Sequence, residues 1–431
     1  MQHARLLSAT TLVASTFALP IACDDRGGAT GSGGSGGGDS ALSYYRDAKP
    51  ILDAKCVNCH AEGGIGPFRL DSYEAVAEHA TAVKAAVVAG TMPPWMPGDD
   101  CNEYLDDRSL DEAQIDVLAR WVDAGAPSGE PADEGPPLVL GDSRALSRVD
   151  LELGLDAPYE MRVEPDDYRC FVIDWPGTET SYVTGFGAAP GNAAVVHHVI
   201  AFLATPSQVD AALALDAAEE GPGYTCYGGP GFNGEWIGAW APGGEGLDMP
   251  EGTGIRIEPG SKVVMQVHYN SLTAGKQPDQ TRLRFKVDAE VSSVARLQPW
   301  ANPQWLQGDT MAIPPASDGV EHSWAQDPTL FFSGGKPIRI HSSLLHMHQL
   351  GKTARLSIEH ADGSETCLLD IPRWDFHWQG SYALIEPARL APGDRLRVRC
   401  TWDNPTTELV TWGEGTTDEM CLGGFYYTVE D

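Results

Sequence analysis

Short runs of strand-forming residues, interrupted by Gly and Pro, constrain the fold of this chain more than any other feature. Residues 281–288 (TRLRFKVD) and 395–400 (RLRVRC) alternate between charged and apolar side chains, whereas 262–269 (KVVMQVHY) is mostly apolar and 425–429 is rich in aromatic residues. A period of two places successive side chains on opposite faces of a strand. Because 48 Gly and 31 Pro also supply many turns, the region from about residue 150 is predicted to form antiparallel β-sandwiches.

The first part of the chain has a different pattern, which predicts a small all-α unit. Its three helical segments are residues 41–54, 73–89 and 109–123. In the third, Asp111 and Glu112 are expected in the first turn and Gly125 follows the end, as helix termini prefer. The turn-rich acidic residues 129–137 (GEPADEGPP) then indicate a linker.

At 431 residues, the chain is too long for one ordinary domain. We predict a multidomain fold, in which the small all-α domain precedes two antiparallel, jelly-roll-like β-sandwich domains. The strand-forming region exceeds one sandwich, but no internal repeat locates the division between two. The predicted order is an export segment, a flexible tether, the helical domain, a linker and two sandwiches: residues 1–23, 24–40, 41–128, 129–149, 150–289 and 290–431.

The N-terminus is typical of an exported protein. Arg5 precedes an apolar stretch at residues 6–18, which is too short to span a bilayer. Cys23 follows small residues, as in a bacterial lipoprotein, although Pro20 departs from that pattern, and a Gly- and Ser-rich tether comes next. We expect a periplasmic or cell-surface lipoprotein that touches the membrane only through a lipid on Cys23. A plain cleaved signal peptide is the alternative.

The net charge of −32 argues against a nucleic-acid partner. Phosphate backbones would be repelled over much of such an acidic surface. Acidity is otherwise a matter of solubility and says little about function.

Residues 56–60 (CVNCH) have the attachment pattern of a covalent c-type haem. Cys56 and Cys59 lie one helical turn apart to bond the haem vinyl groups, and a neutral His60 would be the proximal iron ligand. A zinc knuckle would need a second ligand pair at suitable spacing, which the sequence lacks. A redox disulfide does not account for the adjacent histidine.

The sixth iron ligand has three candidates. Met92 and Met96 lie in the Pro-stiffened residues 91–97 (TMPPWMP), and a thioether there would raise the haem potential. Residues 56–125 resemble small bacterial cytochrome c domains that carry a TMPPW loop and a C-terminal helix ending in a segment such as WVDAGAP. The resemblance implies Met92. His79 is the remaining candidate, but its Ala-rich helix suggests a surface residue.

Four places in the β region gather imidazole and thioether groups: His197 with His198, His268, His346 with His348, and Met420. A single strand histidine is more often structural than a ligand. His346 and His348 are two apart, so on a strand they would point to the same face and could bind one metal. His197 and His198 are adjacent, so sharing one ion requires a bulge or a strand end.

In combination, these residues resemble the copper type II, ascorbate-dependent monooxygenase family. Over residues 150–431 the resemblance runs in order through VVHHVIAF, VVMQVHYN, HMHQLGK and TTDEMCLGGFYY. It implies two copper ions: a three-histidine copper that stores and passes an electron, and a second copper where oxygen binds. The implied ligands are His197, His198 and His268 for the first, and His346, His348 and Met420 for the second. Imidazoles suit both copper oxidation states and a thioether favours Cu(I).

The resemblance also bears on the disulfides. In the family the residue after the Met ligand is disulfide-bonded, which implies a bond from Cys421 to Cys400. Cys170 and Cys226 would join two parts of the first sandwich. Cys101 and Cys367 remain by elimination, without a positive argument for pairing them.

Three departures from the family concern the substrate. Peptide-hydroxylating members have an Arg where this chain has Leu344, and Asn and Tyr where it has Leu422 and Gly424. Their loss argues against a peptide ending in glycine. The remaining histidines match no family ligand and are interpreted as structural: His322, His341, His360 and His377.

The predicted function is insertion of one oxygen atom from O2 into a C–H bond of a small-molecule or peptide substrate. Electrons would reach copper from the haem, which ascorbate or another one-electron donor would reduce. The alternative is an exported redox or copper-holding protein without oxygenase activity. A scaffold with structural metals is a second alternative.

Overall fold

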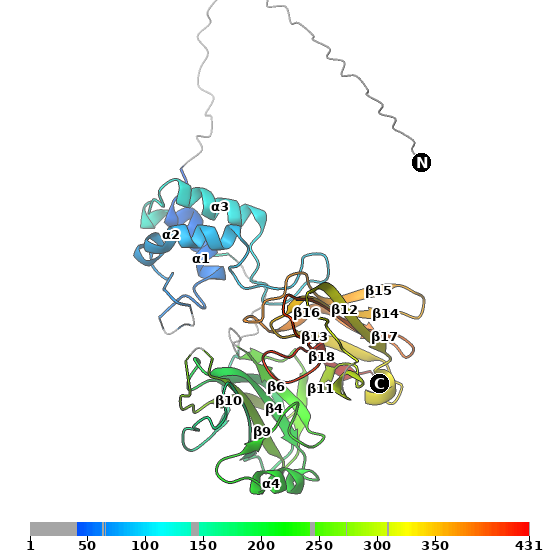
Figure 1. The fold of residues 1–431 in the computed structure, drawn as a ribbon. Helices are drawn as coiled ribbons and strands as arrows, with labels where there is room; N and C mark the ends of the chain where they lie inside the picture. Colours follow the sequence, from blue (N-terminus) through cyan, green and yellow to red (C-terminus); the bar gives the residue numbers. More distant parts are fainter. Residues whose placement is uncertain are drawn as a thin grey trace, which may run out of the picture. The chain divides into compact units, whose positions relative to one another are not determined.

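Three α-helices form the first part of the chain. The computed structural model describes residues 41–430 apart from 63, 65, 139–145, 242–245, 273 and 308–309. A π-helical turn, Tyr44–Ala48, leads into α1 (Lys49–Lys55), followed by α2 (Tyr73–Val88) and α3 (Glu112–Asp123) (Figure 1). These elements confirm the three helical segments. Their buried side chains, including Tyr44 and Trp121, make a core of their own.

The start of α3 differs in detail from the prediction. Asp111 is the N-cap and not a first-turn residue: its side chain accepts a hydrogen bond from Gln114 N, and the Gln114 side chain accepts one from Asp111 N. This capping box satisfies two amides that would otherwise lack partners. Gly125, with φ of 88°, follows the helix end as expected.

Strands dominate from residue 151 onward. In chain order they are β1 (Leu151–Gly154), β2 (Asp166–Asp174), β3 (Ser181–Ala189), β4 (Val196–Ala204), β5 (Tyr224–Thr225), β6 (Glu235–Trp240), β7 (Leu247–Asp248), β8 (Thr253–Ile257), β9 (Lys262–Asn270), β10 (Arg282–Asp288), β11 (Ser293–Trp300), β12 (Ser317–Gln326), β13 (Ile338–His346), β14 (Gly351–Glu359), β15 (Glu365–Ile371), β16 (Ser381–Leu390), β17 (Arg395–Asn404) and β18 (Leu422–Val429). Short helices α4 (Val209–Ala217) and α5 (Thr329–Phe332) lie between them, with 3₁₀ turns at Pro131–Asp133 and Trp305–Gln307.

The strands pair into two sheets, almost entirely antiparallel. The larger runs β1-β10-β3-β8-β11-β6-β4-β9-β2-β5, with β7 on β3, and continues from β11 through β18 and β13 to β16. The smaller has the order β12-β17-β14-β15. One apolar core gathers around residues 159–295 and another around 300–427. Because β11 pairs with β6, β8 and β18, the large sheet is continuous across the division that we predict at residues 289/290.

Residues 98–105 depart from the expectation of a self-contained helical domain. Gly98 N donates to Asp370 O, Leu105 N donates to Ala383 O, and Tyr104 forms an isolated bridge with Leu384. Tyr104 is also buried in the core of the second sandwich. This segment therefore belongs structurally to the sandwich, although it lies between α2 and α3 in the sequence.

All three disulfides that the cysteine count allowed are present. Cys170–Cys226 and Cys400–Cys421 confirm the two expected pairings. Cys101 is bonded to Cys367, a pairing that the sequence left open. The export segment, the tether and Cys23 lie outside the described residues, as does part of the linker. No helix within the described ranges is long and apolar enough to cross a membrane.

Candidate metal centres

Three histidines converge between neighbouring strands β4 and β9. His197 and His198 lie near the start of β4, and His268 lies opposite His198 on β9. One ring nitrogen from each lies within 4.8 Å of the others. The ring centroid of His268 is 4.8 Å from that of His197 and 4.9 Å from that of His198.

An irregularity in β4 makes this convergence possible. The pairing of β4 with β9 shifts register between Val196 and His198. An extra residue in one strand turns a side chain away from its regular face. The bulge or strand end that adjacent His197 and His198 require is therefore present.

The surroundings of His268 leave one nitrogen available as a ligand. His268 Nε2–H donates to Asp166 Oδ1 at 2.9 Å, while Nδ1 is buried and has no hydrogen-bond partner. Tyr168 stacks on the ring at a centroid distance of 3.9 Å. The carboxylate selects the tautomer whose Nδ1 lone pair is free. A buried acceptor without a partner is costly, and a bound Cu ion would satisfy it, so the donor set fits copper.

The second group lies at the end of β13 and the start of β18. His346 is the last residue of β13, His348 lies just beyond it, and Met420 precedes β18. The two rings are 5.1 Å apart between centroids. The expectation that both histidines lie within a strand is therefore wrong for His348, whose backbone has already left the sheet where it bonds Glu419.

Hydrogen bonds also set the tautomers in this group. His346 Nδ1–H donates to Gln379 Oε1 at 2.5 Å, and His348 Nδ1–H donates to Asp418 O at 3.0 Å. Both Nε2 atoms therefore keep their lone pairs for a metal. Two imidazoles and the buried thioether of Met420 form a donor set that suits copper, and Cu(I) in particular.

Glu419 connects the backbones of the two ligand segments. Its carboxylate is completely buried and accepts from His348 N at 2.9 Å, Leu350 N at 2.6 Å, Met420 N at 3.3 Å and Trp402 Nε1 at 2.9 Å. Burial raises its pKa to about 7. One acidic side chain thus holds His348 and Met420 in place together.

The histidines of both groups are kept neutral. Burial, together with neighbouring imidazoles, lowers the pKa of His197 to about 2 and of His348 to about 3. Burial lowers the pKa of His346 to about 4, and the pKa of His198 is also far below its ordinary value. Neutral imidazole is the form that binds a metal.

The two groups are close to each other. The ring centroids of His198 and His346 are 6.3 Å apart. Phe376 stacks on His197 at 4.7 Å and meets His348 edge-on at 6.1 Å. An aromatic side chain from the loop between β15 and β16 therefore contacts a candidate ligand residue of each group.

Comparison with protein families agrees with this geometry. Residues 157–276 match the N-terminal domain, and residues 305–430 the C-terminal domain, of "Copper type II ascorbate-dependent monooxygenase". This part of the chain belongs to that family. Both histidine groups lie within the matched residues.

Individual relatives are distant. Tyramine beta-hydroxylase of Caenorhabditis briggsae is 27% identical over 55% of this chain and 40% of its own length. Dopamine beta-hydroxylase of Bos taurus is 26% identical over 60% of this chain and 43% of its own length. DBH-like monooxygenase protein 1 of Homo sapiens is 27% identical over 55% of this chain and 40% of its own length. The chain thus spans about two fifths of these relatives. A chain of Sulfolobus Turreted Icosahedral Virus, with a TM-score of 0.24 and 8% identity over 65% of this chain and 90% of that chain, supports no argument.

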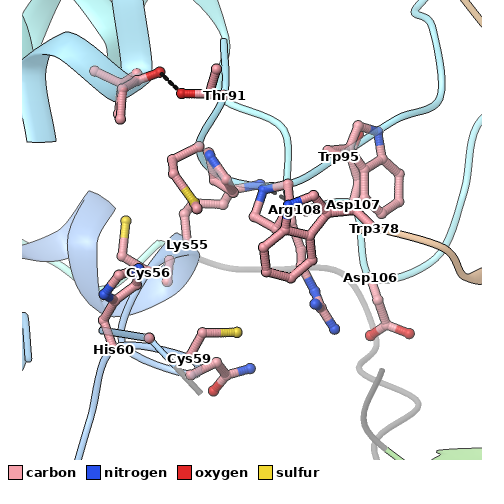
Figure 2. Close-up of a pocket in the computed structure, with 18 of the residues that line it drawn as sticks. Lys55, Cys56, Cys59, His60, Thr91, Trp95, Asp106, Asp107, Arg108 and Trp378 are labelled. Atoms are coloured by element: carbon pink, nitrogen blue, oxygen red, sulfur yellow. Dashed lines mark hydrogen bonds between the residues drawn. The ribbon is translucent and has the colours of Figure 1, made fainter. Parts of the chain in front are cut away.

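A cavity of about 870 Å³ is lined by Cys56, Cys59 and His60 from the helical part of the chain and by Trp378 from the second sandwich. Its volume is typical of a cofactor site. Figure 2 shows Cys56 and His60 on one side of the cavity and Trp95 and Trp378 on the other. Among the described cysteines, Cys56 and Cys59 are the two outside the disulfides.

The chemistry of this cavity fits a c-type haem. His60 is buried, and its Nδ1–H donates to Phe68 O at 2.8 Å, which leaves Nε2 as a ligand atom. Burial raises the pKa of Cys56 to about 12. Redox Cys-X-X-Cys motifs show the opposite shift.

The candidates for sixth haem ligand lie in different places. Met92 lines the cavity with His60. Met96 is buried in the core of the second sandwich, and His79 stacks on Phe68 at 4.2 Å. The structure brings Met92 to the same cavity as His60.

The histidines interpreted as structural have local partners. His322 bonds Ala312 O, His341 bonds Thr428 Oγ1, and His360 bonds Asp394. His377 is exposed beside Asp375. Sequence reasoning missed Asp166, Gln379 and Phe376. No local pattern marks them, whereas Glu419 could have been noticed beside Met420.

Proposed function

We propose that this chain is a copper-dependent monooxygenase whose electrons pass through its own covalent haem. One atom of O2 enters a substrate C–H bond, and the other leaves as water with two electrons and two protons. The observation that carries this proposal is the three-histidine group within the family-matched residues, above all buried His268, whose Nδ1 lacks a hydrogen-bond partner. When bound, copper supplies one-electron redox chemistry and the activation of O2.

The protein residues hold the two copper ions in different environments. His197, His198 and His268 offer three imidazoles, a set that suits both copper oxidation states, so we assign this group to electron storage. His346, His348 and Met420 add a thioether, and we assign this group to the oxygen reaction. Asp166 and Gln379 fix the tautomers that present the ligand atoms.

We assign the 870 Å³ cavity to a haem, which Cys56 and Cys59 would bind covalently and whose iron His60 and Met92 would ligate. Lys55 and Arg108 also line this cavity and suit the acidic groups of a haem (Figure 2). External ascorbate or another one-electron donor would reduce the haem. The family role of the three-histidine copper makes that copper the expected acceptor.

The substrate region favours an apolar or small molecule over a peptide with a C-terminal glycine. Leu344 on β13 pairs with Gly424 on β18. A Cβ built at Gly424 would lie 2.8 Å from Leu344 Cγ, so the leucine fills the space that a larger residue would need. Without polar groups at these positions, nothing there would bind a substrate carboxylate.

We further propose that the protein is exported and anchored by a lipid on Cys23. Three disulfides among the described residues suit an oxidising compartment outside the cytoplasm. Labelling with a radioactive fatty acid, with Cys23→Ala as the control, tests the anchor. Label retained by the variant would disprove it.

The oxygenase proposal is tested with reduced, copper-loaded protein incubated in air with candidate metabolites. We expect two copper ions per chain, and a substrate that gains one oxygen atom, labelled when ¹⁸O₂ is supplied. Copper that binds without any O2 consumption would favour the redox-only alternative.

For the haem, acid–acetone extraction should leave the colour on the protein, and haem released into the solvent would overturn the covalent attachment.

A further inference from the structure

The loop between β15 and β16 contains a short stretch, residues 374–379, that contacts three separate sites. We name it the bridging segment. Trp374 Nε1 donates to His348 O at 3.1 Å, and Trp378 N donates to Asp375 O at 3.1 Å to close a turn. The first bond attaches the segment to the backbone of His348, and the second closes a turn within it. Nothing in the monooxygenase assignment above explains why this loop should touch all three sites.

The first contact is with the haem cavity. Trp378 lines the cavity together with Cys56, Cys59 and His60 (Figure 2). It is contributed by the second sandwich, whereas the CVNCH residues come from the helical part of the chain. The indole is therefore in the wall of the proposed haem site.

The second contact is with the His346 group. Gln379 directly follows Trp378, and its Oε1 accepts from His346 Nδ1 at 2.5 Å. Gln379 Nε2–H donates to Phe376 O at 2.9 Å, so the amide orientation is defined by both of its ends. One covalent step along the backbone and one hydrogen bond thus connect the cavity wall to a proposed copper ligand.

The third contact is with the three-histidine group. Phe376 stacks on His197 with 4.7 Å between ring centroids and an interplanar angle of 23°. It lies two residues before Trp378, within the same turn. The segment therefore ends in two branches, one to each group of copper ligands.

We propose that the bridging segment is the route by which electrons leave the haem and reach both copper sites. The inference rests on the proposed function. Each transfer oxidises one Fe(II) to Fe(III) and reduces one Cu(II) to Cu(I), and an external one-electron donor such as ascorbate re-reduces the iron. Trp378 serves both branches, Gln379 serves the His346 site, and Phe376 serves the His197 site. Each copper then receives its electron directly, which extends the expectation that the three-histidine copper alone is the acceptor.

The experiment uses the full chain with haem bound and both coppers oxidised, under argon. A laser flash releases less than one equivalent of a photoreductant, and absorbance follows haem reduction and re-oxidation. Rapid freezing and electron paramagnetic resonance then show which Cu(II) signal has decreased. In the wild type, re-oxidation should be fast, dependent on copper and independent of protein concentration.

The variants separate the branches. Trp378→Leu should abolish the fast re-oxidation phase, and Trp378→Phe should restore part of it. Gln379→Leu should slow loss of the His346-site signal alone. Phe376→Leu should slow loss of the three-histidine-site signal more than that of the His346 site, because Phe376 stacks on His197 at 4.7 Å and meets His348 only edge-on at 6.1 Å. His377→Ala is the matched control, because its side chain is in the same segment but 83% exposed. It should react like the wild type.

Haem spectrum and copper content, measured for every variant, exclude simple misfolding. Fast re-oxidation that persists in Trp378→Leu, with haem and copper retained, would overturn the bridging role. Wild-type haem that is not re-oxidised by copper at all would instead disprove the proposed haem-to-copper relay. The two failures are therefore distinguishable.

Discussion

Single polar residues outside the proposed ligand sets determine which nitrogen His268 and His346 can offer. Asp166 and Gln379 each accept a hydrogen bond from a ring N–H, so the opposite ring nitrogen keeps its lone pair for the proposed metal. Such partners orient a ligand and raise its basicity. Asp166 and Gln379 lie outside the sequence motifs, whereas Glu419, which holds the backbones of His348 and Met420, lies within one.

Asp166→Asn tests this at the three-histidine group. An amide can donate from its NH₂ group to His268 Nε2. This favours the tautomer that carries its proton on Nδ1, the nitrogen proposed to bind copper. We expect copper affinity at this site to fall on the order of 10- to 100-fold, measured by competition with a Cu(I) chelator. Asp174→Asn at the other end of β2, where the side chain is 83% exposed, should bind copper like the wild type. Equal loss in both variants would indicate a general effect of β2.

Glu419→Gln tests the second group. Four N–H groups donate to this carboxylate. In glutamine an NH₂ group replaces one of the two oxygens, and because NH₂ is itself a donor it cannot accept these bonds. We expect the free energy of unfolding to fall by about 1–3 kcal/mol, and the Cu–S signal of Met420 to weaken in X-ray absorption. Glu365→Gln, on the partly exposed strand β15, should change stability by less than about 0.5 kcal/mol. An unchanged Cu–S signal would mean that Glu419 supports the fold without positioning Met420.

At the scale of elements, several of the proposed ligands lie at irregular places in or beside otherwise regular strands, whereas His268 lies within β9. His197 lies at the register shift of β4, His346 ends β13, and Met420 precedes β18. Regular strands alternate their side chains and cannot bring neighbouring residues to one ion. The surrounding strands hold these irregular positions fixed, which suits a site that must keep its geometry.

The disulfide between β17 and the start of β18 should stabilise the Met420 position specifically. Cys400–Cys421 closes a sequence separation of 21 residues, for which a bond is worth about 3 kcal/mol. In a Cys400→Ala/Cys421→Ala variant, we expect lower stability and loss of the Cu–S signal before loss of the three-histidine copper. The control removes Cys170–Cys226 and should lower stability while preserving Cu–S. Retention of Cu–S in the first variant would contradict this prediction.

At the scale of the whole molecule, the chain from residue 42 onward behaves as one compact unit. Strand β11 continues the large sheet from one apolar core to the other. Residues 98–105 hydrogen-bond to β15 and β16, and Cys101–Cys367 links the same regions covalently. The helical region, with the proposed haem cavity, is therefore attached to the second sandwich by more than a flexible linker.

Removing Cys101–Cys367 tests this attachment. The bond closes a separation of 266 residues, which the chain-entropy treatment values at about 5.5 kcal/mol. In Cys101→Ala/Cys367→Ala we expect the helical region to unfold at a lower urea concentration than the sandwiches. Haem absorbance would monitor the helical region, and far-ultraviolet circular dichroism would monitor the whole chain. Copper content should not change. A single transition shifted as a whole would show instead that the helical region and the sandwiches remain one cooperative unit.

The sequence by itself determined the local structure and the chemical types at the proposed sites. Period-two runs such as 281–288 became β10, and residues 73–89 became α2, because burial of one face imposes its own periodicity. The order of imidazole and thioether residues likewise indicated copper before any geometry was known. The roles of the individual ligands stay predictions until metal binding is measured.

Only the tertiary structure decided which distant residues meet. The bulge that turns His197 toward His268 depends on the pairing of β4 with β9. The contact of Gln379 with His346 joins residues that are 33 positions apart in the sequence. Residues 98–105 likewise joined the second sandwich in spite of their place between two helices. Local periodicity carries no information about such contacts, because they arise from the packing of segments far apart in the chain.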